Sequence, residues 1–307
     1  MRSAGWHLTE DINDLLARAG DFLCSRPVMH NTPLTTLEKL RTCGTDADGA
    51  GATVFFGRLE EEGEVRAVFY RTRRGRLTLT PLSPEQANSL AAHLADLGHA
   101  FCGVTADHDT ATAFAGAWQR HTGAAPVRDW RGLLHRLAAL TPPQPVPAGR
   151  GRPAGKRDQE HVIRWCREFA ADVGEAVTVD AASWAGTRFA DKHYTFWETP
   201  DGTPVSMAGA NPLVGGQVRV DPVYTPAHRR GRGYAGAVTA EVSRAALTAG
   251  AREVVLFTDP ENAISNAVYR RIGYVPVCHF TGYGFSPRRA EAGWEDDRPT
   301  ARPASDS

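Results

Sequence analysis

The spacing of apolar and polar residues divides the chain into two series of helices and strands. In the first series, helical spacing predicts helices at about 10–24 and 35–41. The runs ATVFFGRL and VRAVFYRT, joined by the acidic turn EEEGE, predict a β-hairpin. RLTLTPL predicts a third strand, and Ser83 and Pro84 begin a helix. After this helix come the strand FCGVTA, a helix to about His121 and a strand near Trp130.

The second series repeats this order. Helices are predicted at 158–171 and at about 181–191, followed by the strands HYTFWE, VSMAGA and QVRVDPVYT, of which the first two form a hairpin. A helix from about Gly231 to Gly250 comes next, and the strand EVVLFT, a helix through SNAVYRRIG and the strand YVPVCHF complete the series. The repeated order predicts a duplicated fold, although the two halves share no evident sequence motif.

The segment PPQPVPAGRGRPAGKR separates the two series and offers almost no side chain to a core. We therefore expect it to be a linker between two domains. This predicts an N-terminal domain at 1–141, a linker at 142–157 and a C-terminal domain at 158–286. Residues 287–307 are charged and rich in proline, so we expect a disordered tail.

The composition argues against several classes of protein. A chain of 307 residues, 42% of them apolar, suffices for two ordinary domains. The 35 basic and 35 acidic residues cancel, so no overall field draws the chain to nucleic acid. Five scattered cysteines without a CxxC pair predict neither a disulfide framework nor a metal site. No stretch suits a secretory signal or a membrane span, so we expect a cytoplasmic protein that does not bind membranes.

A basic, glycine-rich segment, AHRRGRGYAG, lies between the strand QVRVDPVYT and the next helix. Pro226 ends the strand, and the helix begins among the residues that follow. A helix start presents unsatisfied N–H groups at the positive end of the helix dipole, and glycine lets the backbone approach an anion closely. On its own the segment is equally consistent with a phosphate-binding loop and with a connecting turn.

The flanking segments favour the phosphate-binding loop. Arg230-x-x-Gly233-x-Ala235 resembles the R/Q-x-x-G-x-G/A signature of the GCN5-related N-acetyltransferases, the GNAT family, and VVLFTD and NAISNAVYRRIGY follow in the family's order. The resemblance covers 218–277 well and the second half more loosely. It implies an α/β (α+β) fold of two tandem GNAT-like domains. Each would have a mixed, mostly antiparallel sheet with splayed central strands flanked by helices.

The resemblance also implies an acyl-CoA site in the second half, with acetyl-CoA as co-substrate, a small-molecule primary amine as acceptor and no metal. The pantetheine arm is expected to pair with the backbone of Val223, Tyr224 and Thr225. Asn262 would contact that arm or order its loop, and Ser265 and Asn266 would cap the following helix. The pyrophosphate is expected to lie against Arg230, Gly231, Arg232, Gly233, Tyr234, Ala235 and Gly236.

Tyr269 is the candidate general acid. It lies four residues after Ser265 on a short helix that follows a strand, so its phenol can point toward the sheet gap and protonate the leaving thiolate. An N–H from the Val223 region could stabilise the oxyanion. Asp221 in the third strand and Glu198 at the end of the first are alternative general bases, and the sequence does not separate them.

The first half has the element order without the site. SPEQANSL stands where the glycine loop should lie, and Phe114 or Trp118 stands in the place of the tyrosine, which indicates a degenerate copy without a cofactor loop. Two other functions remain open. The donor could be an aminoacyl-tRNA, which only the basic linker supports. Alternatively, the protein could be a non-catalytic acyl-CoA sensor. We expect a monomer or a homodimer.

Overall fold

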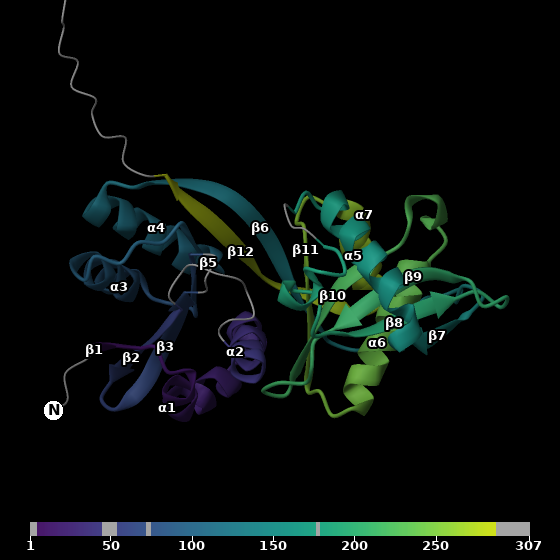
Figure 1. Ribbon diagram of the computed structural model, residues 1–307, viewed down its shortest axis with the longest axis horizontal. Helices are drawn as coiled ribbons and strands as arrows, with labels where there is room; N and C mark the ends of the chain where they lie inside the picture. The colour runs from purple at the N-terminus through teal and green to yellow at the C-terminus, as the bar shows by residue number, and fades with distance from the viewer. Residues whose placement is uncertain (1–4, 45–53, 72–74, 176–178, 287–307) are drawn as a thin grey trace, which may run out of the picture.

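The computed structural model describes residues 5–44, 54–71, 75–175 and 179–286. Within these ranges the strands form one 12-stranded sheet in the order β1-β2-β3-β4-β5-β12-β6-β11-β10-β9-β8-β7. The two halves of the chain lie side by side along this sheet (Figure 1). The expected disordered tail at 287–307 lies outside the described residues.

The N-terminal half follows the predicted order, with one additional strand at its start. Its elements are β1 (Gly5–Thr9), α1 (Ile12–Ser25), α2 (Asn31–Cys43), β2 (Phe55–Glu61), β3 (Glu64–Arg71), β4 (Arg76–Leu79), α3 (Pro84–Asp96), β5 (Gly103–Asp107), α4 (His108–Thr122) and β6 (Ala125–Leu137). β1 pairs antiparallel with β2 at the edge of the sheet.

The C-terminal half repeats this order. Its elements are β7 (Arg150–Pro153), α5 (Gln159–Asp172), β8 (His193–Glu198), β9 (Pro204–Ala210), β10 (Gln217–Tyr224), α6 (Tyr234–Thr248), β11 (Glu253–Thr258), α7 (Ala263–Arg271) and β12 (Tyr274–Ser286). Three short 3-10 turns, at Lys156–Asp158, Trp184–Gly186 and Ala227–Arg229, lie between these elements.

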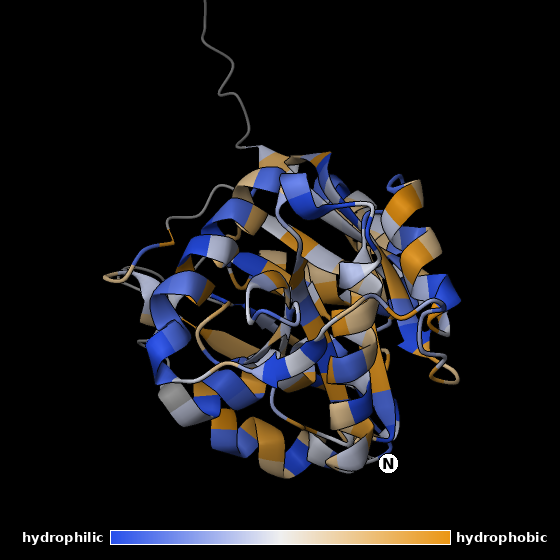
Figure 2. Cartoon of the chain, turned by 90° about the vertical axis from the view of Figure 1, so that its right-hand side faces the viewer, coloured by the Kyte–Doolittle hydropathy of each residue, from blue (hydrophilic) through white to orange (hydrophobic). Residues whose placement is uncertain are grey.

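The alternation of side chains along the strands places a helical layer on each face of the sheet. In the N-terminal half, Phe56 packs with α1 and α2, whereas its neighbour Phe55 packs with α3 and α4. In the C-terminal half, Phe196 packs with α5 and Trp197 packs with α6. Figure 2 shows polar and apolar residues alternating along the outer helices, as expected when one side of a helix faces the sheet.

Each half contributes its last strand to the sheet of the other half. β12 lies between β5 and β6, and β6 lies between β12 and β11. The two strands pair antiparallel from Tyr274↔Leu137 to Ser286↔Ala125. The expected division into separate sheets at 1–141 and 158–286 therefore needs correction at these two strands. The hydrophobic pattern of a strand does not show which half will pair with it, because only the alternation is encoded locally.

The expected linker at 142–157 also needs correction, because β7 lies inside it. Arg152 of β7 pairs antiparallel with Phe196 of β8, and its guanidinium holds Glu198 at 2.6 Å and Asp158 at 2.8 Å. These ion pairs give a polar edge strand fixed partners. The sequence pattern misses it because its residues show no apolar alternation.

The helix predicted at about 181–191 is wrong. Only a 3-10 turn at Trp184–Gly186 forms there. The backbone N–H of Ser183 donates to Asp180 Oδ1 at 2.8 Å, and the N–H of Asp180 donates to the Ser183 hydroxyl at 3.1 Å. Such side-chain bonds offer the backbone an alternative to the helical ladder.

Candidate functional site

The strands β10 and β11 diverge in the C-terminal half. They pair in parallel only at their starts, the last pair being Arg219↔Val255. Further along, β10 pairs only with β9, with a register shift between Val220 and Val223, and β11 pairs only with β6. Among the described residues, the backbone of β10 from Val220 to Tyr224 therefore has no strand partner on the β11 side. This is the splay of central strands that the resemblance to the GNAT family implies.

The end of β10 is fixed from the β9 side. The hydroxyl of Ser206 donates to the carbonyl of Tyr224 at 3.0 Å and lies 2.8 Å from the Thr225 hydroxyl. Val223 is half-buried and packs at the margin of the core formed by β8 to β11, α6 and α7. The predicted segment Val223, Tyr224 and Thr225 thus borders the side of β10 that lacks a strand partner, in a rigid setting.

The glycine loop leads directly into α6. Gly231 and Gly233 have positive φ values of 77° and 80°, a region that side chains disfavour. A Cβ at Gly231 would meet no atom within 4 Å, and one at Gly233 would meet only Pro147, at 3.9 Å. No side chain caps α6. The loop backbone is therefore open, and the N–H groups of the first helical turn remain available to an anion.

The arginines of the loop have different surroundings. Arg230 Nε donates to the carbonyl of Thr225 at 2.9 Å, and the same guanidinium pairs with Asp172 of α5. Arg230 thus ties the loop to β10 and α5. Arg232 is exposed, and its side chain has no ion-pair or hydrogen-bond partner in the described part of the chain. Arg232 can therefore add positive charge to the loop.

The start of α6 lies against α7. Gly236 is buried, and a Cβ there would lie 3.5 Å from Val268 and 3.9 Å from Ile272, both on or next to α7. Tyr234 and Ala235 are half-buried, and Tyr234 packs at the margin of the same core as Val223. The small residues after the loop therefore bring the two helices close together.

Tyr269 projects from α7 at the margin of this core and is half-buried. Its ring meets that of Tyr274 edge-on, with centroids 6.1 Å apart. The Tyr274 hydroxyl lies 2.8 Å from Ser243 Oγ, whereas no hydrogen bond to the Tyr269 hydroxyl is formed by any described residue. Burial, Tyr274 and the charge of Asp221 raise the pKa of Tyr269 above its ordinary value. The phenol therefore keeps its proton at neutral pH, as a general acid requires.

The loop before α7 is held differently from the expectation. Asn262 is the N-cap of α7: its Oδ1 accepts from the Ser265 N–H at 3.0 Å, so neither Ser265 nor Asn266 is the cap. Asn266 is buried, accepts from the Thr258 hydroxyl at 2.6 Å and donates to the Asp259 carbonyl at 3.0 Å. Asn266 thus orders the end of β11. Sequence spacing does not reveal which of two nearby asparagines takes which role.

Asp221 lies in a buried cluster of charges. Its Oδ2 is 2.7 Å from Lys192 Nζ and also pairs with Arg188, and the Lys192 side chain is only 1% exposed. Burial alone raises the pKa of Asp221, but Lys192, Arg188 and Arg219 together hold it below its ordinary value. A carboxylate with a lowered pKa is a weak base. The environment therefore does not support Asp221 as the general base.

Glu198, the other candidate base, is 9% exposed and is held by Arg152 at 2.6 Å. It lies at the end of β8, two strands away from β10 and beside the edge strand β7. The structure does not bring it to the unpaired side of β10.

Glu168 of α5 is a carboxylate that the sequence reasoning missed. It accepts a hydrogen bond from the Tyr224 hydroxyl at 2.9 Å. Burial, followed by Glu168, raises the pKa of Tyr224, so the tyrosine remains the donor. Glu168 and Asp172 lie one turn apart on α5, and both reach the end of β10 and its loop. The only sequence signal is an acidic pair at helical spacing, which is common on exposed helices.

In the N-terminal half, the described segment between β4 and α3 contains no glycine loop. Ser83 Oγ accepts from the Gln86 N–H at 3.2 Å, and the Gln86 side chain accepts from the Ser83 N–H at 3.0 Å, so a capping box occupies the start of α3. Phe114 and Trp118 are buried and stack at 6.1 Å between centroids. Neither side chain carries a hydroxyl, so neither could act as the general acid expected of Tyr269.

The described residues contain neither a cluster of metal ligands nor a helix that could span a membrane. No group of three or more His, Cys, Asp or Glu side chains in this part of the chain is arranged to hold a metal ion. None of its helices combines the length and the apolar character that crossing a bilayer requires.

Comparison with known proteins gives a family and a fold. The family model described as "Acetyltransferase (GNAT) family" matches residues 160–274. A tandem GNAT protein from the clavulanic acid biosynthesis pathway is 13% identical, with a TM-score of 0.56 over 92% of this chain and 98% of that chain. A GCN5-related N-acetyltransferase from Sphaerobacter thermophilus is 19% identical, with a TM-score of 0.54 over 92% and 96% of the two chains.

A GNAT-family acetyltransferase from Colwellia psychrerythraea is 11% identical, with a TM-score of 0.55 over 92% of this chain and 99% of that chain. No curated protein matches the chain. These likenesses span both halves and confirm the predicted tandem GNAT fold.

Proposed function

This chain belongs to the GNAT family of acetyltransferases, and we propose that its C-terminal half transfers an acetyl group from acetyl-CoA to a primary amine of a small molecule. The observation that carries the proposal is the uncapped start of α6 behind two left-handed glycines, next to the unpaired side of β10. A loop that served only to connect two elements would not need open backbone at both glycines.

The loop suits the pyrophosphate of acetyl-CoA. The N–H groups from Gly231 to Gly236 face no capping side chain, and the dipole of α6 adds positive potential at the same place. Arg232 supplies an exposed positive charge, and Arg230 holds the loop to Asp172 and Thr225. The backbone of Val223 to Thr225 is then the natural partner for the amide groups of the pantetheine arm, because it lacks a strand on that side.

Acetyl-CoA supplies a thioester carbonyl that an amine can attack. During attack the backbone N–H near Val223 stabilises negative charge on the carbonyl oxygen. Tyr269 donates its proton to the departing thiolate, since its raised pKa keeps it protonated and no described residue occupies its hydroxyl.

We assign removal of the amine proton to Glu168, acting through water. Asp221 is ion-paired with Lys192 and Arg188, and Glu198 is held by Arg152. Glu168 instead accepts a hydrogen bond from the Tyr224 hydroxyl, which orients the carboxylate. Glu168 is half-buried, and its carboxylate lies beside the end of β10 on the α5 side.

The proposal is tested by measuring thiol release from acetyl-CoA with a panel of primary amines. Tyr269→Phe should lower kcat about 100-fold and leave the acetyl-CoA Kd unchanged. Tyr274→Phe is the matched control, because that neighbouring hydroxyl is already bonded to Ser243 and should hardly affect kcat. Acetyl transfer by Tyr269→Phe at the wild-type rate would remove the general acid from the account, and a chain that releases no thiol with any amine would contradict the transferase itself.

A further inference from the structure

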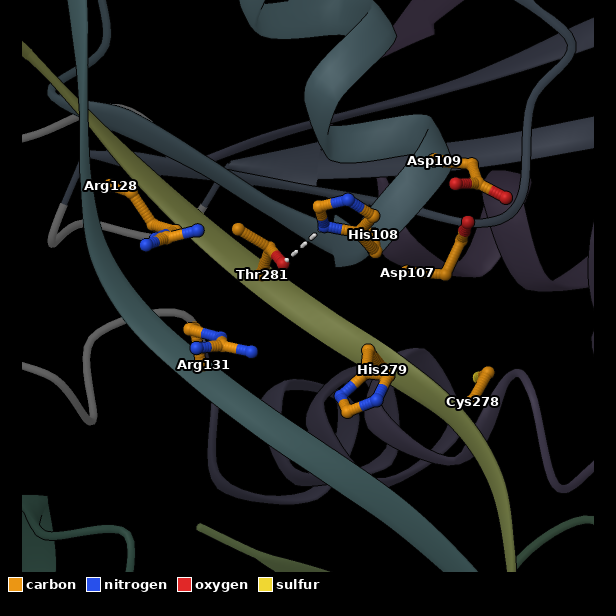
Figure 3. A pocket seen from close by; sticks show the side chains of 8 residues that line it. All are labelled: Asp107, His108, Asp109, Arg128, Arg131, Cys278, His279 and Thr281. Carbon is orange, nitrogen blue, oxygen red and sulfur yellow. Dashed lines mark hydrogen bonds between the residues drawn. The ribbon is translucent and has the colours of Figure 1, made fainter. Parts of the chain in front are cut away.

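A pocket lies in the centre of the molecule, away from the loop before α6. It has a volume of about 360 Å³, at the low end of the range that small-molecule sites occupy. Its walls are the end of β5, the start of α4 and the paired strands β6 and β12 (Figure 3). Its lining residues are Asp107, His108, Asp109, Arg128, Arg131, Cys278, His279 and Thr281.

Opposite charges line opposite sides of this pocket. Figure 3 shows Arg128 and Arg131 on β6 at one side and Asp107 and Asp109 near the start of α4 at the other. No described residue forms an ion pair or hydrogen bond with the side chains of Arg128 and Asp109. Arg128 and Asp109 therefore face the pocket without a described partner, beside Arg131, which pairs with Glu261, and Asp107, which caps α4.

One carboxylate oxygen of Asp107 has no hydrogen-bond donor among the described residues. Its Oδ1 caps α4 by accepting from the Thr110 N–H at 3.2 Å. Its Oδ2 is inaccessible to solvent and has no hydrogen-bond partner. Buried carboxylate oxygens are normally paired, so this one calls for a donor that no described residue supplies.

His108, Thr281 and Cys278 line the middle of the pocket. His108 Nδ1 lies 3.0 Å from the Thr281 hydroxyl, which orients the ring across the middle of the pocket. Burial, with the charges of Asp107 and Asp109, raises the pKa of the Cys278 thiol to about 11, so it carries no charge at neutral pH. The two arginines and two aspartates supply the pocket with charges of both signs.

This pocket is distinct from the proposed acetyl-CoA site. Its residues come from β5, α4, β6 and β12, whereas the acetyl-CoA site is built from β10, α6 and α7. One contact connects them: Arg131 pairs at 3.2 Å with Glu261, the residue before the N-cap of α7. Arg128 has no described ion-pair partner, so replacing it breaks no ion pair with the loop before α7.

We propose that this pocket binds a small zwitterion, a molecule such as a free α-amino acid that carries a carboxylate and an ammonium group. The guanidinium groups of Arg128 and Arg131 would take the carboxylate, since a planar fork matches its two oxygens. Asp107 Oδ2 and Asp109 would take the ammonium, which has three N–H donors. A purely anionic or purely cationic ligand would leave one pair of charges unmatched.

The test uses the full chain and three matched sets of probes: the twenty proteinogenic L-amino acids, their carboxamides and their N-acetyl derivatives. Binding is screened by thermal shift and measured by calorimetry. At least one amino acid should bind saturably with a Kd below about 1 mM. Its carboxamide and its N-acetyl derivative should each bind at least 10-fold more weakly, since each lacks one charge.

Arg128→Gln and Asp109→Asn should each weaken that binding at least 10-fold. Both side chains are exposed, so both variants should keep the wild-type unfolding midpoint. Arg66→Gln and Asp96→Asn, exposed residues elsewhere in the N-terminal half, should bind as the wild type does. Absence of saturable binding, equal binding of the single-charge derivatives, or binding that survives both pocket substitutions would overturn the proposal. No step requires turnover, so the outcome is independent of the proposed transferase activity.

Discussion

Replacing Asp221 with asparagine should destabilise the protein in a strongly pH-dependent way. Lys192 has a pKa of about 8 instead of its ordinary 10.5, because burial disfavours its charge and Asp221 only partly compensates. One pKa unit corresponds to about 1.4 kcal/mol, so the charged Lys192 already costs the folded state about 3 kcal/mol. Without the carboxylate at 2.7 Å, this cost rises until Lys192 folds without its proton.

Deprotonation of Lys192 limits how much unfolding free energy Asp221→Asn can lose. At pH 6.5, removing a proton from a lysine of pKa 10.5 costs about 5 kcal/mol, so Asp221→Asn can lose at most about 2 kcal/mol more than the wild type through Lys192. At pH 9.5 both proteins fold with Lys192 neutral, and this loss vanishes. Arg188 and Arg219 keep their charges at both pH values, so any loss through them is the same at each.

The direction of the pH dependence follows from the protons bound at Lys192 in the folded and unfolded states. Between pH 8 and 10.5 the unfolded wild type binds more protons at Lys192 than the folded protein, so stability gains with rising pH in that window. In Asp221→Asn the folded pKa of Lys192 is lower still, and the gain begins at a lower pH.

Urea unfolding, followed by circular dichroism at pH 6.5 and pH 9.5, measures this difference. The free energy lost by Asp221→Asn should be about 2 kcal/mol larger at pH 6.5 than at pH 9.5. Asp221→Asn combined with Lys192→Met should lose the pH dependence, and Asp21→Asn, at an exposed helical position, should change little at either pH. An equal loss at both pH values, or a larger loss at pH 9.5, would refute the reasoning.

Three further substitutions probe the site and the fold. Glu168→Gln keeps a partner for Tyr224 but cannot accept a proton, so kcat for acetyl transfer should fall at least 10-fold with an unchanged acetyl-CoA Kd, and an unaltered pH–rate profile would contradict this role. Asn266→Leu should cost about 2 kcal/mol in urea unfolding because the Thr258 hydroxyl and Asp259 carbonyl lose their partner, and a loss below about 0.5 kcal/mol would contradict it. Gly273→Ala should lower the unfolding midpoint far more than Gly250→Ala, since both have positive φ but only at Gly273 would a Cβ strike the Ala139 carbonyl, at 1.8 Å; equal shifts would contradict this.

The parts of the site that the sequence predicts are those encoded locally. The loop from Arg230 to Gly236 is recognisable because glycine tolerates positive φ and a helix start presents free N–H groups, properties that no distant contact needs to supply. The position of Tyr269 follows for the same reason, since it depends on the spacing along one short helix. Most strands are also found from their alternation of apolar and polar residues.

The parts that the sequence misses depend on contacts between distant segments. β7 is held by pairing with β8 and by the ion pairs of Arg152, and its own residues show no strand pattern. The exchange of β6 and β12 between the halves is a choice among pairing partners that alternation does not encode. The sequence does not show that Lys192, 29 residues away, pairs with Asp221 and lowers its basicity. It also does not show that Glu168 lies beside the Tyr224 hydroxyl.

The central claim is that the loop before α6 holds one acetyl-CoA per chain, and calorimetric titration of acetyl-CoA into the full chain tests it most directly. Gly231→Glu would place a carboxylate beside the open N–H groups. Gly202→Glu is a matched control, because both glycines have positive φ and open space and Gly202 lies outside this loop, in the turn between β8 and β9. The account predicts one site per wild-type chain, binding at least 10-fold weaker in Gly231→Glu, and wild-type binding in Gly202→Glu. No binding to the wild type, two sites per chain, or undiminished binding by Gly231→Glu would contradict it.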